Sequence, residues 1–332
     1  MPAEGAAAGT SSPRPCRICG GTEGNRELVA REMMYGTRER FPYLSCAGCG
    51  CLQIAELPGD LARHYPRDYF SFAAPPDADA AGWPRRALRR WRDGYALSGR
   101  GAIGRWLYRQ RPYPELRSLS LVRGLRRDHR ILDVGAGAGT LLRALAARGF
   151  TGLLGVDPYL ERDLVLPGGL RILKRGLEEV AGPWDVIMFH HVFEHLADPV
   201  AVLRAAAERL APEGRVLVRL PLASSWAFRH YGVDWVQLDA PRHLYLHSRA
   251  SLERVAAAAG LSVQAAAWDS TAFQFWGSEQ YARDLPLRAP GSHATDPARS
   301  PFTPRQIADF ERRAAALNRE QAGDQAAFVL AR

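Results

Sequence analysis

Short apolar runs alternate with segments of helical spacing from Arg130 to the C-terminus. The first two runs, Ile131–Val134 and Leu153–Val156, have the length of buried strands, and Asp198 before Pro199 is a typical helix start. Alternating strands and helices are typical of a parallel sheet covered on both faces. We therefore predict an α/β, doubly wound, Rossmann-like domain over residues 130–332. Later strands are expected at Asp185–Phe189, Val216–Leu220, Leu261–Trp268 and Ala326–Ala331, with an insertion at residues 269–325.

The cysteines set the N-terminal region apart, because all five lie within the first 51 residues. Two Cys-x2-Cys pairs are separated by 26 residues, and a glycine follows each pair. Glycine permits the tight turn that aims two thiolates at one ion, and four thiolates suit tetrahedral zinc. We predict a structural zinc ribbon over residues 16–56, with Cys51 as a spectator; incidental or redox-active cysteines are the alternative. The expected ligands are Cys16, Cys19, Cys46 and Cys49.

Residues 57–129 are expected to form a basic helical linker or cap. Trp83, Trp91 and Tyr95 recur at helical spacing among arginines. Between Trp83 and Arg130, 14 arginines against three acidic residues give a net charge of +11, although the whole chain carries only +9. Such a helix can pack its aromatic stripe on the main domain, cover a pocket for an anionic ligand, or lie on a membrane surface. We favour packing of the aromatic stripe on the main domain. We also predict that the basic segment sits over the cofactor cleft and helps to hold an anionic acceptor such as a nucleotide-sugar diphosphate.

The first predicted strand runs into a glycine-rich turn, Gly135-Ala-Gly137-Ala-Gly139. Doubly wound sheets bind ligands at the carboxyl end of the first strand. A dinucleotide fingerprint would require glycine at Thr140, and Asp133 within the strand is foreign to it. The turn, with Asp157 at the end of the second strand, closely resembles motif I and the following acidic residue of class I S-adenosylmethionine-dependent methyltransferases.

This resemblance implies S-adenosylmethionine as cofactor. Asp133 and the glycines would hold the loop and the methionine ammonium, Asp157 would bind both ribose hydroxyls, and Leu177 would contact adenine. The implied cofactor residues are Asp133, Gly135, Ala136, Gly137, Gly139, Asp157, Pro158, Leu177, His190 and Tyr69.

The resemblance extends beyond the turn, and the cysteine pairs are similar to the N-terminal zinc module of bacterial sugar methyltransferases, a branch associated with surface-polysaccharide genes. The His190–His195 segment looks like the His-x-x-x-Glu-His motif of the small-molecule branch. The Trp235–His243 segment is similar to their active-site segment, although Arg242 replaces the expected acidic residue. The resemblance implies a small, anionic, sugar-containing acceptor such as a nucleotide-sugar or glycan precursor.

Methyl transfer from a sulfonium to a hydroxyl or an acidic carbon requires alignment and removal of a proton. Histidine suits that role because its unperturbed pKa is ~6.5. His195 is the predicted general base, and His243 a second acid/base or orienting group, with Asp239 and Arg242 in the acceptor pocket. Helix capping for His195 and ordinary packing for His243 are the alternatives.

Composition limits the remaining possibilities. Hydrophobic residues make up 47% and charged residues 24%, and no apolar run approaches the ~18 residues of a membrane span. Residues 1–15 lack the apolar core of a secretory signal, so we expect a disordered leader and a cytoplasmic protein. Nucleic-acid methylation is the rival activity, but the His190–Phe193 region lacks the expected Asp/Asn-Pro-Pro-aromatic motif, and the catalytic region has no cysteine nucleophile. A non-catalytic cofactor-binding scaffold is the third possibility, and peripheral membrane contact stays open.

Overall fold

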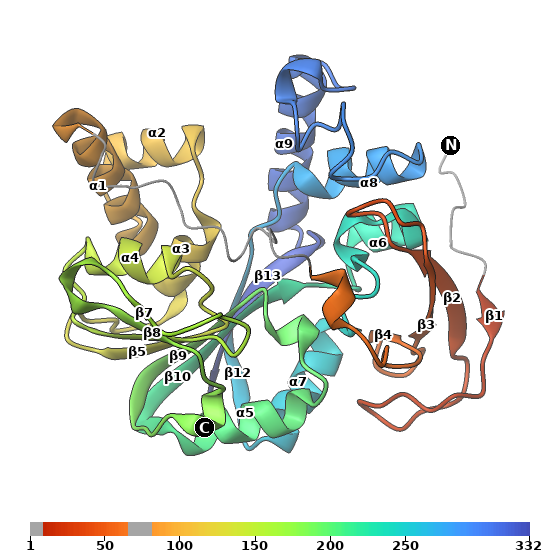
Figure 1. Ribbon diagram of the computed structural model, residues 1–332, viewed down its shortest axis with the longest axis horizontal. Coiled ribbons are helices and arrows are strands. Elements are labelled where there is room, and N and C mark those ends of the chain that lie inside the picture. Colours follow the sequence, from red (N-terminus) through yellow and green to blue (C-terminus); the bar gives the residue numbers. More distant parts are fainter. Residues whose placement is uncertain (1–8, 66–81) are drawn as a thin grey trace.

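The computed structural model describes residues 9–65 and 82–332, and its largest element is an eight-stranded sheet (Figure 1). The strand order is β12-β13-β10-β9-β5-β6-β8-β7. Neighbouring strands are parallel from β10 to β8, whereas β13 is antiparallel to β10 and β12, and β7 is antiparallel to β8. The strands are β5 (Arg130–Val134), β6 (Gly152–Val156), β7 (Leu164–Val165), β8 (Arg171–Leu173), β9 (Trp184–His190), β10 (Leu210–Pro221), β12 (Ser262–Trp268) and β13 (Gln325–Ala331). All six predicted strands are present. The sheet is mixed and not purely parallel, because β13 runs antiparallel to both of its neighbours and β7 runs antiparallel to β8.

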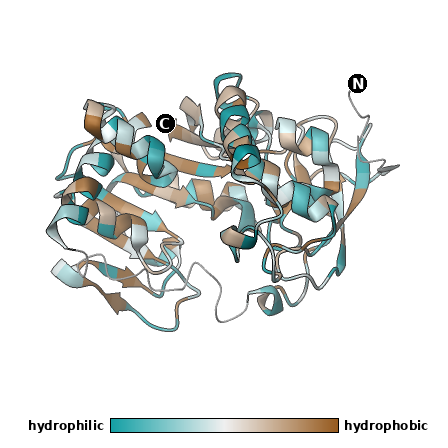
Figure 2. Ribbon diagram, turned by 90° about the horizontal axis from the view of Figure 1, so that it is seen from above, coloured by the Kyte–Doolittle hydropathy of each residue, from teal (hydrophilic) through white to brown (hydrophobic). Residues whose placement is uncertain are grey.

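Helices cover both faces of this sheet. α3 (Pro114–Ser118) and α4 (Thr140–Ala146) lie on one face, and α5 (Pro199–Glu208) and α7 (Arg249–Ala258) on the other (Figure 1). Alternate residues of each strand enter different cores: Ile131 packs with the α4 side, and Leu132 with the α5 side. Figure 2 shows apolar residues concentrated along the strands. The period of two therefore places Asp133 on the same side as Ile131, toward α4.

The N-terminal region forms a second, five-stranded sheet in the order β1-β2-β3-β4-β11. Its last strand comes from far along the chain and pairs antiparallel with β4. Tyr43 and Ile54 share one core with Trp235 and Leu246, so this sheet is docked onto the segment that precedes α7. The strands are β1 (Thr10–Ser11), β2 (Arg26–Arg31), β3 (Arg40–Ser45), β4 (Leu52–Ile54) and β11 (Tyr245–Leu246).

α1 (Trp83–Ser98) and α2 (Ala102–Gln110) form a hairpin above α3 and α4 (Figure 1). They approach closely at Gly104, where an added Cβ would lie 2.5 Å from the carbonyl oxygen of Trp91. Tyr95 packs on Tyr108, with 5.6 Å between the ring centroids. Trp83 and Trp91, however, are 75% and 53% exposed. The expectation that the aromatic stripe packs on the main domain is therefore wrong for these two tryptophans.

Three further helices pack together: α6 (Trp226–Tyr231), which lies between β10 and α7, and α8 (Phe273–Ala282) and α9 (Pro304–Arg319), which follow β12. α8 and α9 belong to the predicted insertion. Tyr281 of α8 packs with Met33, Met34 and Val236, so the insertion contacts both the N-terminal sheet and the segment before β11. Among the described residues, no helix combines the length and apolar character needed to cross a membrane.

Candidate functional site

The glycine-rich turn after β5 brings two carboxylates together at the carboxyl edge of the sheet. Asp133 and Asp157 are 4% and 5% exposed. The Asp157 carboxylate accepts hydrogen bonds from the backbone N–H groups of Gly137 and Tyr159, both at 3.0 Å. Gly135, Gly137 and Gly139 all have positive φ, between 52° and 76°, which other residues avoid. The glycines are therefore required by the backbone of this turn.

No cation balances these carboxylates within the described part of the chain, where neither forms an ion pair. Burial, and then the charge of Asp157, raises the pKa of Asp133 to about 7. Burial also raises the pKa of Asp157, although its two N–H donors oppose the shift. A ligand that carries positive charge would relieve this repulsion, so the turn fits a cationic cofactor.

The other predicted cofactor residues lie around the same edge, with one exception. Ala136 lies within the turn, and Pro158 follows Asp157 on the surface. Leu177 is buried just beyond β8. His190 ends β9, and neither of its ring nitrogens has a hydrogen-bond partner in the described structure, while burial lowers its pKa. Tyr69 lies outside the described residues.

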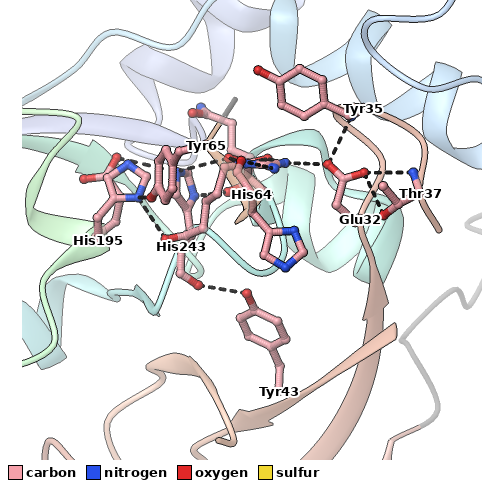
Figure 3. A network of polar contacts seen from close by, with 12 residues as sticks. Glu32, Tyr35, Thr37, Tyr43, His64, Tyr65, His195 and His243 are labelled. Carbon is pink, nitrogen blue, oxygen red and sulfur yellow. Dashed lines mark hydrogen bonds and ion pairs between the residues drawn. The ribbon is translucent and has the colours of Figure 1, made fainter. Parts of the chain in front are cut away.

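His195 and His243 meet beyond the end of β9, with their ring centroids 4.7 Å apart (Figure 3). The Nδ1 of His195 lies 2.8 Å from the carbonyl oxygen of Arg242 and 3.0 Å from the hydroxyl of Tyr65. The Nδ1 of His243 lies 2.8 Å from the carbonyl oxygen of Gln237. A carbonyl only accepts, so both Nδ1 atoms carry a proton. In the neutral form of either ring, Nε2 would then be the proton-accepting atom.

The two histidines differ in their surroundings. His243 is 8% exposed, and burial followed by the charge of His195 lowers its pKa to about 4. His195 is only half-buried. Glu194, which is fully buried, lies beneath both: burial opposes its ionisation, but a hydrogen bond from His191 and the neighbouring histidines lower its pKa to about 2. A permanent negative charge therefore lies beneath the pair.

Arg242 and Asp239 pair with each other in a cluster of charges, and Arg242 also lines a small pocket beside Glu32. Arg242 is fully buried, and its guanidinium donates to Asp239 at 2.6–3.1 Å, to Glu32 at 2.8 Å and to the carbonyl oxygen of His64 at 3.2 Å (Figure 3). The negative charge of Asp239 compensates for the burial of the Arg242 guanidinium. Burial opposes the ionisation of Asp239, but the charge of Arg242 lowers the pKa of this carboxyl. Their place in the acceptor pocket stays a prediction; their contacts also support a positioning role, because the carbonyl oxygen of Arg242 orients His195.

A second buried arginine was missed in the sequence. Arg219 is 1% exposed near the end of β10, donates to Asp269 at 2.7 Å, lies 3.3 Å from Glu115 and contacts the Nε2 of His191. His191 in turn hydrogen-bonds Glu194 at 3.3 Å. This charged chain ties α3 to the histidine pair. A signal existed, because Arg219 interrupts the apolar run Val216–Leu220.

The arginine-rich segment only partly approaches the cofactor turn. Glu115 reaches the carboxyl edge, where it lies 3.3 Å from Arg219. Burial, followed by neighbouring carboxylates that include Glu115, raises the pKa of Tyr113. A groove of about 1290 Å³ beside α1 and α2 is lined instead by residues just before β5 and β6, such as Arg127 and Phe150. Those positions mark the amino edge of the parallel strands. The arginines that line this groove therefore do not face the cofactor turn.

The four predicted metal ligands form one cluster. The sulfur atoms of Cys16 and Cys49 are 3.7 Å apart, those of Cys19 and Cys46 are 3.5 Å apart, and all four lie within 4.8 Å of one another. Zn–S bonds of ~2.3 Å in a tetrahedron place sulfurs about 3.8 Å apart. Cys51 is outside the cluster, and its buried thiol points to the carbonyl oxygen of Leu52. The arrangement is consistent with a zinc ribbon.

Comparisons with known proteins agree with this geometry. Residues 105–266, just under half of the chain, match a family model described as a methyltransferase domain. The match and the strand order confirm the predicted Rossmann-like class I methyltransferase fold.

The chain is similar to the ubiquinone biosynthesis O-methyltransferase of Aeromonas salmonicida, with 31% identity over 153 residues that cover 41% of this chain and 63% of the relative. The protein of the same name from a Caulobacter strain is 36% identical over 102 residues, covering 27% and 39%. The chain thus spans less than two thirds of the length of these relatives. A chain from the Haloferax volcanii complex between the Trm112 activator and a methyltransferase has 19% identity and a TM-score of 0.44, covering 72% of this chain and 96% of its own. Neither relative is named for a sugar acceptor.

Proposed function

We propose that this chain is an S-adenosylmethionine-dependent methyltransferase that transfers a methyl group to an oxygen of a small-molecule acceptor. The observation that carries the proposal is the shared position of two features at one edge of the sheet. The carboxylates Asp133 and Asp157 lie at a glycine turn where no described residue supplies a cation, and His195 and His243 meet beyond the end of β9 with Nδ1 held by a carbonyl oxygen.

The cofactor would be held by the residues around the turn. S-adenosylmethionine supplies an electrophilic methyl group on a sulfonium and also carries an ammonium group. Asp133 would pair with the ammonium, which its uncompensated burial favours, and Asp157 can accept from two vicinal hydroxyls because it has two oxygens. His190, whose ring nitrogens lack partners among the described residues, offers a further hydrogen bond to a ligand.

His195 is the better candidate for the general base. A general base must be accessible to the acceptor and must bind the proton that it removes. His195 is half-buried, and its Nδ1 is held by the carbonyl oxygen of Arg242, which leaves Nε2 to face the acceptor. His243 is more buried, and its pKa of about 4 makes it a weak acceptor at neutral pH. We assign His243 an orienting role, with Glu194 stabilising the positive charge that His195 would acquire.

Two acceptor classes are open to test. The similarity of Trp235–His243 and of the N-terminal cysteines to sugar methyltransferases supports a sugar-containing acceptor, such as a nucleotide-sugar or glycan precursor. The names of the relatives support a phenolic hydroxyl of a quinone precursor as a second candidate. The relatives are O-methyltransferases, which supports oxygen over carbon as the methylated atom.

The cysteine cluster would hold one structural zinc ion. Four thiolates leave no coordination position for water or substrate, so the ion would stabilise the fold and take no part in the reaction. The cytoplasm suits four reduced thiols, and we propose it as the compartment.

The test uses S-adenosylmethionine with a deuterated methyl group and mass spectrometry of two panels, nucleotide-sugars and hydroxylated aromatic compounds. We expect label on one panel with the wild-type protein. His195→Ala should lower turnover ~10²- to 10⁴-fold and leave cofactor affinity by calorimetry nearly unchanged. His230→Ala, an exposed histidine on α6, is the matched control and should retain full turnover.

Other outcomes would contradict parts of the proposal. Label on RNA or DNA and on neither panel would favour nucleic-acid methylation. Near-normal turnover of His195→Ala with an inactive His243→Ala would exchange the two roles. Absence of cofactor binding in the wild-type protein would overturn the proposal as a whole.

A further inference from the structure

The hairpin of α1 and α2 gathers exposed apolar side chains. In the described residues, nine large hydrophobic side chains are exposed, and five of them lie on this hairpin. Soluble proteins keep such residues scattered, so their concentration on two packed helices indicates a surface that binds something. The five are Trp83 (75% exposed), Leu88 (44%), Trp91 (53%), Ile103 (57%) and Trp106 (61%).

The same hairpin carries a concentrated positive charge. Residues 82–111 contain nine arginines and one acidic residue, Asp93, and eight of the nine arginines are exposed. Only Arg92, which is half-buried, pairs with Asp93; the other eight form no ion pair with a described residue. The adjoining groove is lined by five arginines, Arg90, Arg100, Arg123, Arg127 and Arg148, and by no acidic residue. The surface therefore favours an anionic partner.

We propose that the α1–α2 hairpin docks the protein on an anionic lipid bilayer. Tryptophan side chains settle at the boundary between headgroups and acyl chains, and arginines pair with lipid phosphates. Leu88 and Ile103 support a bilayer over nucleic acid, because aliphatic side chains gain from an apolar layer but cannot stack on bases. The proposal goes beyond the methyl-transfer function and does not depend on it.

The position of the hairpin leaves the site open. The basic groove lies at the amino edge of the parallel strands, whereas the cofactor turn and the histidine pair lie at the carboxyl edge. Docking through the hairpin would therefore not place the arginines of the groove over the cofactor turn.

The test is co-sedimentation of the full chain with two kinds of vesicle. One contains phosphatidylcholine alone, and the other also contains roughly 30 mol% of the anionic lipid phosphatidylglycerol, which attracts basic segments. We expect binding to the anionic vesicles that weakens with salt, and little binding to neutral ones. Arg85→Glu/Arg86→Glu/Arg89→Glu and, separately, Trp83→Ser/Trp106→Ser should each lower partitioning about tenfold or more. The control Arg40→Glu/Arg254→Glu/Arg319→Glu makes the same charge change on β3, α7 and α9, and should bind as the wild type.

Folding and cofactor affinity of each variant are checked by circular dichroism and calorimetry, which should be unchanged because none of these side chains touches the site. Equal binding to both vesicle types, equal losses in the control, or salt-sensitive binding to RNA or DNA without vesicle binding would overturn the proposal. Loss of methyl transfer with intact vesicle binding would concern only the proposed function.

Discussion

Two pairs of carboxylates, of which three members are buried and Asp239 is nearly so, distinguish two regions of this protein, and only one pair has a cation among the described residues. Glu32 and Asp239 meet the guanidinium of Arg242, and the pKa of each carboxyl is lowered despite burial. Asp133 and Asp157 are buried to a similar extent but meet no cation among the described residues, and the pKa of each is raised. Burial alone therefore does not set the charge of these groups; the neighbouring cation does.

The difference separates a charge cluster that is complete without a ligand from one that we propose binds a ligand. The Arg242 cluster is complete without any ligand, because the protein supplies both signs of charge and fixes the carbonyl oxygen that orients His195. The Asp133 turn carries an electrostatic cost that a cationic ligand would remove. The cysteine cluster resembles the second case, since four thiolates need a metal cation to lie within 4.8 Å of one another.

The largest effect is expected at the cysteines. Cys46→Ser should remove one thiolate from the cluster and abolish zinc binding, which in small zinc modules contributes on the order of 10 kcal/mol to folding. Elemental analysis should find about one zinc per chain in the wild-type protein. Cys51→Ser is the matched control and should retain the metal, because Cys51 lies outside the cluster. Metal-free wild-type protein, or full retention in Cys46→Ser, would refute the zinc ribbon.

The next effect is expected at the complete carboxylate centre. Arg242→Gln should leave Glu32 and Asp239 buried without a cation and lower the free energy of unfolding by about 3–5 kcal/mol. Urea denaturation measures this change. Arg254→Gln, on the exposed face of α7, should change stability by less than about 0.5 kcal/mol. If Arg242→Gln lowered the free energy of unfolding only slightly, the two carboxylates would be able to take up protons at little cost. Arg242 would then not be what distinguishes this pair from Asp133 and Asp157.

A smaller effect is expected at the cofactor turn. Asp157→Ala should remove hydrogen bonds to the ribose hydroxyls worth roughly 1.5–3 kcal/mol, about a tenfold to hundredfold loss of S-adenosylmethionine affinity. Isothermal calorimetry checks this, with the exposed Asp60→Ala as control. Unchanged affinity in Asp157→Ala would remove Asp157 from the site.

The smallest effect concerns pH. In the proposed function the cofactor ammonium would pair with the ionised form of Asp133, whose pKa burial raises to about 7 in the free protein. As the pH falls below about 7, Asp133 takes up a proton that must be released on binding, so the affinity should fall by at most about tenfold per pH unit. Above pH 8 the affinity should be constant with respect to this group.

Asp133→Asn tests whether this group causes the pH dependence. The variant should bind S-adenosylmethionine more weakly at pH 8 and show a flatter profile between pH 6 and pH 8. A variant that keeps the full slope would assign the titration to another group, with Asp157 the first alternative because its pKa is also raised.

The sequence by itself determined the elements whose cause is local. Runs of mostly apolar residues predicted the six strands, and in β9 and β13 nearly every residue is buried, which requires apolar side chains on both faces. Gly135, Gly137 and Gly139 have positive φ, a conformation that favours glycine over other residues. The turn could therefore be predicted from its glycines alone. The Cys-x2-Cys pairs place two sulfurs side by side through a single short turn.

Only the tertiary structure decided which distant segments meet. Glu32 and Arg242 are 210 residues apart, and Tyr65 and His195 are 130 residues apart, yet each pair is in hydrogen-bond contact. β11 joins the N-terminal sheet, and β13 is antiparallel to the strand beside it, β10. The sequence of neither strand indicates which strand it pairs with or in which direction. The spacing of Trp83 and Trp91 predicted a helix but not their exposure, because helical periodicity defines a face and the packing of the remaining chain determines whether that face is covered.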